Sequence, residues 1–179
     1  MGEHPLWRLW SMRAMYLALC IFLIFFNLMP LETIPRAWAG PDLLAAFTCA
    51  WVLRRPEYVP VLAVASIALL ADFLYQRPPG LWAALMVLIT EGLRARAISL
   101  RDQSFIVEWI TVTSGLIILA LSYRIILAML LVDQAPLGLS LIQLIMTLAC
   151  YPIAVLITIT LFRVRRPSLA EVNALGQRL

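Results

Sequence analysis

Three ionisable residues lie inside or beside long apolar runs of this 179-residue chain. Asp72 and Glu91 each border a run without charge, and Arg124 lies well within another. A charged side chain at the centre of a bilayer costs about 2.5 to 3.5 kcal/mol on insertion scales, so such residues usually face protein or water and mark functional positions. Small residues share the helical face of each of the three, which predicts that these faces turn toward neighbouring helices.

The residue patterns that hydrolytic enzymes use inside membranes are missing from the sequence. It contains no HExxH motif, no Gly-x-Ser-Gly loop and no pair of aspartates at mid-depth. The only histidine, His4, lies near the N-terminus, where we expect a solvated side chain. Cys20, Cys49 and Cys150 lack metal-ligand spacing. We therefore expect no enzyme activity, no cofactor, no metal and no nucleic-acid partner.

Composition places the chain among integral membrane proteins. Hydrophobic residues make up 63% of it and charged residues 13%, and the mean hydropathy is +0.93, far more apolar than a soluble domain. About 20 apolar residues cross the hydrocarbon core as a helix. We predict one all-α, six-helix transmembrane domain over residues 1–162 with a short second helix, followed by a basic tail at 163–179. The predicted spans are 14–31, 41–53, 58–75, 79–97, 111–132 and 137–162.

Basic residues predict the orientation. All 14 are arginines, and six spans with both termini in the cytoplasm place eleven of them inside. Arg36 and Arg77 fall outside, where we expect Arg77 to be solvated, and Arg124 lies within a span. Omitting the short second span would reverse every later loop. A cleaved signal peptide ending at the AWA of residues 37–39 is the alternative for the N-terminus, but its apolar run is too long.

Two arrangements of the buried charges remain open. In the first, Asp72 and Arg124 pair, or both contact the transmembrane helix of a partner. In the second, Asp72 reaches the outer interface, Glu91 offsets Arg94 three residues later, and Arg124 extends toward the outer surface. The segment RPPG at 77–80 predicts a short outer hairpin that makes the third and fourth helices antiparallel neighbours.

The segment SIALLADFLYQRPPGLWAALMVLITEGLRAR, residues 66–96, resembles the rod shape-determining protein MreD family. That family has an L-L-x-D run, a P-x-G or x-x-G turn and then a small apolar helix. Leu69, Leu70, Asp72, Pro79 and Gly80 match this pattern. Length, six spans and short loops are also similar over nearly the whole chain. The resemblance implies a fold similar to the substrate-binding components of energy-coupling-factor transporters, which have six helices with a short second one.

The resemblance also implies a function. It predicts a nonenzymatic scaffold of the bacterial inner membrane that supports rod shape and lateral peptidoglycan synthesis. The implied partners are MreC and, through it, MreB, RodA and the elongation transpeptidase, together with membrane lipid. Candidate partner-binding or polar anchor residues are Asp72, Pro79, Gly80, Arg124 and Glu91.

The alternative is a vitamin-binding component of an energy-coupling-factor transporter. Such a protein needs an outward-facing pocket with converging polar or aromatic groups. The outer halves of the predicted helices offer Asn27, Asp42, Asp72, Arg77, Tyr123, Arg124 and Gln134.

Overall fold

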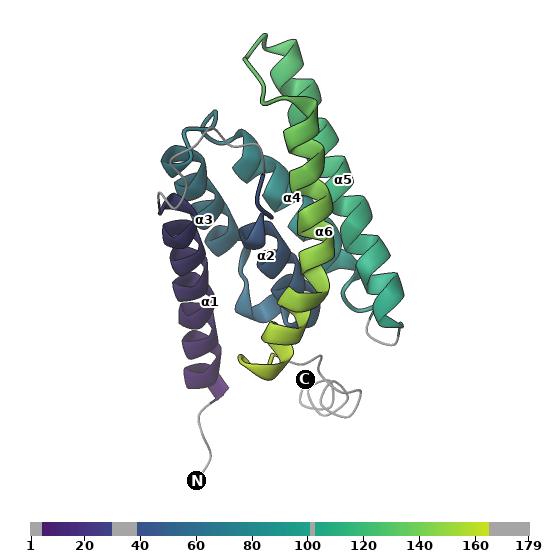
Figure 1. Ribbon diagram of the computed structural model, residues 1–179. Coiled ribbons are helices and arrows are strands. Elements are labelled where there is room, and N and C mark those ends of the chain that lie inside the picture. The colour runs from purple at the N-terminus through teal and green to yellow at the C-terminus, as the bar shows by residue number, and fades with distance from the viewer. Residues whose placement is uncertain (1–4, 30–38, 101–102, 165–179) are drawn as a thin grey trace.

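A computed structural model describes residues 5–29, 39–100 and 103–164 (Figure 1). Within these residues the chain is all-helical, and the predicted bundle of six helices with a short second one is confirmed. The helices are α1 (Pro5–Leu28), α2 (Leu43–Arg54), α3 (Val61–Leu74), α4 (Leu81–Arg96), α5 (Phe105–Met129) and α6 (Leu137–Thr160), with a single 3₁₀ turn, η1 (Pro56–Tyr58), between α2 and α3. His4, Arg36, most of the AWA segment and all but the first two residues of the 163–179 tail lie outside the described ranges.

Three of the helices are long and apolar enough to cross a membrane. They are α5, α6 and the part of α1 from Leu6 onward, with 25, 24 and 23 residues respectively. The other three helices have 12, 14 and 16 residues. Both α1 and α5 begin before the predicted spans, at Pro5 instead of 14 and at Phe105 instead of 111. The prediction stopped at charged residues, whereas backbone hydrogen bonding continues a helix through them.

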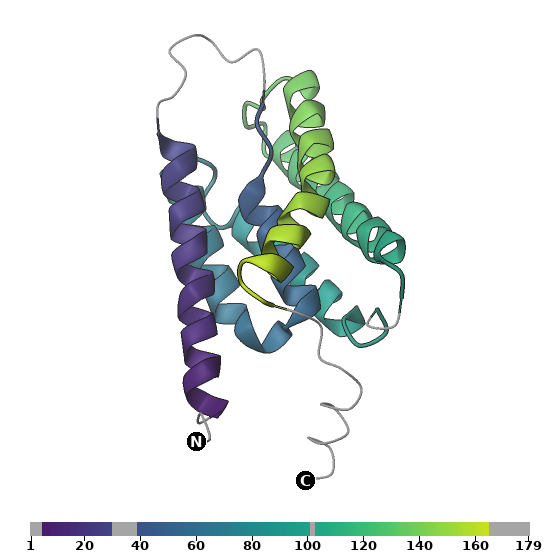
Figure 2. The same cartoon turned by 60° about the horizontal axis from the view of Figure 1, so that its bottom comes forward.

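Consecutive helices run in alternating directions between two ends of the bundle (Figure 1). We call the end with the α3–α4 turn and the α5–α6 loop the turn end, and the end where α1 starts and α6 finishes the terminal end. The short helix α2 lies in the centre and is entered from the turn end (Figure 2). Every residue of α2 from Leu44 to Arg54 is buried, because α1, α4 and α6 all pack around it.

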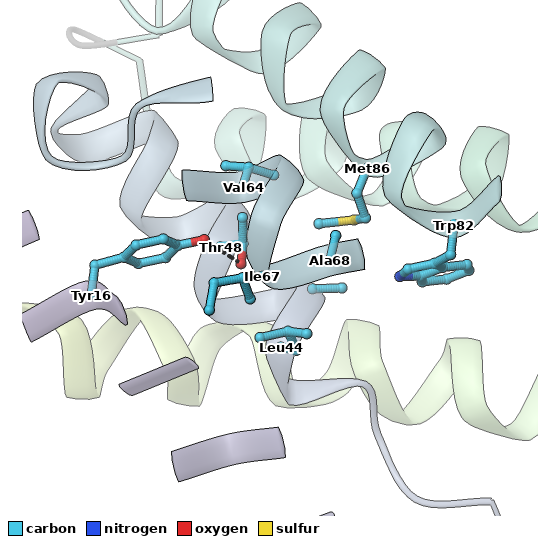
Figure 3. A pocket seen from close by; sticks show the side chains of 9 residues that line it. Tyr16, Leu44, Thr48, Val64, Ile67, Ala68, Trp82 and Met86 are labelled. Atoms are coloured by element: carbon cyan, nitrogen blue, oxygen red, sulfur yellow. Dashed lines mark hydrogen bonds between the residues drawn. The ribbon is translucent and has the colours of Figure 1, made fainter. Parts of the chain in front are cut away.

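The interior between α1, α2, α3 and α4 is closely packed. Tyr16 of α1 and Thr48 of α2 share a buried hydrogen bond of 3.1 Å, and the Tyr16 ring lies 5.7 Å from that of Trp51. Beside them is a void of only about 10 Å³, bordered by Trp82 and Met86 of α4 among others (Figure 3). A space of this size is close to the minimum for one water molecule. The core beside Tyr16 and Thr48 therefore has no room for a ligand.

Candidate functional site

Asp72 ties the end of α3 to the beginning of α4. Its side chain is completely buried, and Oδ2 accepts hydrogen bonds from the backbone N–H groups of Gly80, at 3.0 Å, and Ala83, at 3.2 Å. The first N–H groups of a helix have no partner within it, and a carboxylate is well suited to satisfy them. Asp72 thus acts as an N-terminal cap for α4, supplied by the preceding helix rather than by the cap position itself.

The turn between these helices has a defined backbone conformation. Helix α3 ends in a Schellman arrangement, with the N–H of Arg77 bonded to the carbonyl of Asp72 and that of Gln76 to Phe73. Gln76 adopts φ +55°, a left-handed conformation that glycine more often occupies. Gly80 has φ +88° and ψ −19°, which suits the third position of a type II turn after Pro79. Asp72, Pro79 and Gly80 are therefore parts of one hairpin, as the sequence predicted.

Arg77 is not the solvated side chain that we predicted. It is half-buried, and its guanidinium carbon lies 4.8 Å from the ring centre of Trp82 and 5.1 Å from that of Tyr75. Stacking between two aromatic faces attracts a guanidinium and removes it from water. Its Nη1 atom is buried and has no hydrogen-bond partner. Tyr75 and Trp82 flank Arg77 in the sequence, but a position in a turn does not indicate that their rings lie against the guanidinium.

Arg124 bonds to the α5–α6 loop and not to Asp72. Its Nη1 donates to the carbonyl of Ala135 at 3.1 Å and to Oγ of Ser140 at 2.9 Å, while Gln134 donates back to the Arg124 carbonyl. The side chain therefore extends toward the turn end, as the second predicted arrangement has it. Since Asp72 bonds to α4 instead, the structure does not bring these two charges together as a pair.

A cavity of about 360 Å³ lies at the turn end between α4, α5 and α6, and we call it the turn-end cavity. Its volume is within the range of small-molecule sites. Arg77 and Arg124 both line it, as do Trp82 and Tyr123, whose rings meet edge to face at 5.3 Å. The lining also includes leucines of α5 and four polar side chains, those of Gln134, Ser140, Gln143 and Thr147.

The depth at which α2 begins accounts for this cavity. The backbone N–H of Asp42, at the start of α2, donates to Oγ1 of Thr147, at 2.8 Å. Thr147 lies ten residues into α6, so α2 begins about 15 Å below the start of α6 at 1.5 Å per residue. Asp42 Oδ1 caps α2 through the N–H of Ala45, and both residues line the cavity. Above them no helix of the described residues occupies the centre of the bundle.

Glu91 lies at the other end of α4 and has no connection with the cavity. Its Oε1 accepts a hydrogen bond of 2.8 Å from Nε of Arg94, which is the offset predicted by the second arrangement. Arg94 also donates to the carbonyls of Pro56 and Val59, at 3.0 and 2.6 Å. These bonds secure η1 and the start of α3 against the end of α4, a role in packing that sequence analysis did not assign.

A buried ionic cluster at the terminal end was missed entirely, and we call Arg54, Glu108 and Tyr151 the terminal-end cluster. The Arg54 guanidinium meets the Glu108 carboxylate through two bonds of 2.5 and 3.3 Å, and Tyr151 donates to the same carboxylate at 2.7 Å. The Arg54 and Glu108 side chains are only 4% and 1% exposed. The predicted spans 41–53 and 111–132 leave both residues outside the helices, although the apolar residues around Glu108 are compatible with a helix that includes it.

Trp109 follows Glu108 and compensates for a proline in α6. A proline has no N–H and cannot bond to the carbonyl four residues before it. For Pro152 that carbonyl belongs to Leu148, and the indole Nε1 of Trp109 donates to it at 3.1 Å. The first turn of α5 thus contacts the middle of α6 through adjacent residues, Glu108 to Tyr151 and Trp109 to Leu148.

Three of the polar groupings in the described part of the chain can be compared: the hairpin around Asp72, the terminal-end cluster and the lining of the turn-end cavity. Protein groups bond to Oδ2 of Asp72 in the hairpin, although its Oδ1 is buried without a partner, and they also bond to the Glu108 carboxylate in the terminal-end cluster. The turn-end cavity instead presents polar groups to open space. Comparison with protein families, with curated proteins and with solved structures gives no match for this chain.

Proposed function

We propose that this protein is a nonenzymatic scaffold of the bacterial cell-elongation machinery, similar to MreD, in the inner membrane. The observation that best supports the proposal is the hairpin. The residues through which the sequence resembles that family, Asp72, Pro79 and Gly80, make one unit in which a fully buried carboxylate holds the turn. The arrangement of six helices with a short, central α2 agrees with the fold that the resemblance implies.

In this proposal all six helices lie in the membrane, with the terminal end in the cytoplasm. Arg8, Arg13, Arg55, Arg94 and Arg96 would then be on the cytoplasmic side, in keeping with the usual excess of basic residues there. The hairpin and the turn-end cavity would face the periplasm.

Partners are met through helix surfaces in the proposed mechanism. Large apolar side chains of α1 and α5 point outward, among them Trp7, Phe22, Ile110 and Leu121. Lipid and the membrane helix of a partner such as MreC are the apolar surfaces that can cover them. MreB, RodA and the elongation transpeptidase would be reached through MreC.

A pull-down tests the scaffold proposal. The tagged full-length protein is purified from its own membranes in a mild detergent, and the bound proteins are identified by mass spectrometry. We expect MreC together with wall-synthesis enzymes. Asp72→Ala should lower the recovery of MreC, whereas Arg96→Ala, at an exposed arginine, should not. Recovery of a transporter ATPase in place of MreC would overturn the proposal.

The turn-end cavity supports a second candidate function, the substrate-binding component of an energy-coupling-factor transporter. Of the outer-half polar groups considered from the sequence, five line the cavity: Asp42, Arg77, Tyr123, Arg124 and Gln134. Asn27 and Asp72 are not among its lining residues. Copurification of a transporter ATPase with a vitamin-like molecule would favour this candidate.

A further inference from the structure

The turn-end cavity has the chemistry of a ligand site, whichever partner proteins the chain has. Its volume of about 360 Å³ contrasts with the void of about 10 Å³ among α1 to α4. Trp82 and Ala45 border both spaces, so one side of Trp82 packs against the core and the cavity lies beyond it. A space this large and lined by polar groups holds water or a ligand rather than remaining empty.

Two guanidinium groups border the cavity without a carboxylate partner. Arg124 bonds only to neutral oxygens, those of Ala135 and Ser140, and Arg77 is stacked on aromatic rings with its Nη1 atom buried and unbonded. Among the described residues neither arginine forms an ion pair. The Asp72 carboxylate attracts Arg77 through space, but it does not bond to Arg77, and its Oδ2 is engaged by the N–H groups of Gly80 and Ala83. A partly desolvated guanidinium without a bonded carboxylate is costly, so an anion in the cavity would be favoured.

The acidic residues that line the cavity do not cancel this charge. Asp42 caps α2 through the N–H of Ala45, and its negative charge is offset by the positive end of that helix's dipole. Asp133 is exposed on the α5–α6 loop, where water screens it. The arginines therefore determine the sign of a ligand's head.

The rest of the lining is suited to the apolar part of a ligand. Trp82 and Tyr123 present aromatic surface, and Leu116, Leu119 and Leu127 of α5 add aliphatic surface. We infer that the turn-end cavity binds a small amphiphile whose anionic head, a phosphate or a carboxylate, is held by Arg77 and Arg124 while its apolar part packs against the aromatic pair. The head can belong to a membrane lipid or to a soluble molecule.

Native mass spectrometry of the purified full-length protein in neutral detergent tests this inference with three probes. Dihexanoyl phosphatidylglycerol has an anionic head and acyl chains, phenyl phosphate has an anionic head and a flat ring, and dihexanoylglycerol has acyl chains and no phosphate. We expect a 1:1 adduct with one or both of the anionic probes and at least about tenfold weaker binding of dihexanoylglycerol, as for the loss of one charge-assisted hydrogen bond. Preference for phosphatidylglycerol identifies a lipid ligand, and preference for phenyl phosphate a soluble one.

Variants locate the binding. Arg77→Gln and Arg124→Gln should each weaken the adduct at least about tenfold, while Arg124→Lys should retain part of it and Arg96→Gln should leave it unchanged. Ala120→Leu keeps both arginines and places a larger side chain in the cavity, so it should also weaken binding. This variant tests the inference independently if an arginine variant does not fold. The inference is overturned if no anionic probe binds at millimolar concentration. It is equally overturned if Arg77→Gln, Arg124→Gln and Ala120→Leu all bind like the wild type. Neither result bears on the recovery of MreC.

Discussion

The two ends of this bundle give arginine opposite environments, with an ion pair at the terminal end and none at the turn end among the described residues. At the terminal end, Arg54 is buried against the carboxylate of Glu108, which also accepts a hydrogen bond from Tyr151. At the turn end, Arg77 and Arg124 border an open cavity and contact only aromatic rings and neutral oxygens. The same type of side chain is neutralised by the protein at one end and left available at the other.

This difference teaches how to separate structural charges from functional ones in an apolar chain. A buried ion pair with a third hydrogen-bond donor is complete and offers nothing to a ligand. Arginines beside a cavity without a carboxylate partner are incomplete, and a ligand can supply what is missing. Burial alone does not make the distinction, because Arg54, the most buried of the three, is the least available.

Breaking the terminal-end cluster should have the largest effect on stability. Glu108→Leu leaves Arg54 buried without a counter-charge, and removal of one partner of a buried pair costs about 3–5 kcal/mol. The free energy of unfolding in detergent, measured by denaturant titration, should fall by that amount. Arg54→Leu combined with Glu108→Leu should recover part of the loss.

The matched control for this prediction is Glu91→Leu. The Glu91–Arg94 pair is partly exposed, and pairs of that kind contribute about 0–1 kcal/mol. Equal losses for Glu91→Leu and Glu108→Leu would contradict the structural role that we assign to the terminal-end cluster.

Changes in the α3–α4 hairpin should cause the next largest loss of stability. Asp72→Ala removes the acceptor for the N–H groups of Gly80 and Ala83, and the loss of a helix cap costs up to about 2 kcal/mol. Asp72→Asn keeps one oxygen acceptor and should lose less. Thermal unfolding of the purified variants measures both. If Asp72→Ala has the same melting temperature as the wild type, the hairpin does not depend on this carboxylate.

A smaller loss is expected for Gly80→Ala. Gly80 has φ +88° with open space where a Cβ would be placed, so the change adds backbone strain alone, about 1–2 kcal/mol for an L-residue in the left-handed region. Gly138→Ala is the control, because Gly138 also has open space around it and does not have a positive φ. The two melting temperatures should separate by several degrees, and a common value would argue against strain at Gly80.

The smallest effect is expected for the coupling between Asp72 and Arg124, the two charges that the structure does not pair. Because Asp72 and Arg124 bond to different groups, reversing both charges should not restore what either single reversal loses. The coupling energy from the double-mutant cycle should lie within about 0.5 kcal/mol of zero. A coupling of several times that size would mean that the two charges do interact, and would connect the hairpin to the cavity.

Much of the fold followed from hydrophobic patterning and charge. The short second helix was predicted from the distribution of arginines, and α2 at Leu43–Arg54 is close to the predicted 41–53. The RPPG turn was predicted from proline and glycine chemistry. Helix starts were less well predicted, since α1 and α5 extend past Arg13 and Glu108 into segments that were taken as loops.

The candidate site was predicted only in part, for a physical reason. Contacts within a hairpin, such as Asp72 with Gly80, follow from nearness in sequence. The meeting of Arg54 with Glu108 or of Trp82 with Tyr123 depends on which helices pack together, and a single sequence holds no direct record of that. The turn-end cavity likewise follows from the depth at which α2 begins, which helix length alone does not determine.

The terminal-end cluster has a consequence for biosynthesis. Glu108 lies 54 residues after Arg54, so at roughly 5–20 residues per second the ribosome adds it about 3–11 s later. Until then Arg54 lacks the carboxylate to which it bonds in the folded chain. A nascent chain that ends before Phe105 lacks this counter-charge however well α1 to α4 pack. The ion pair at the end of α2 can therefore form only after the start of α5 has been synthesised.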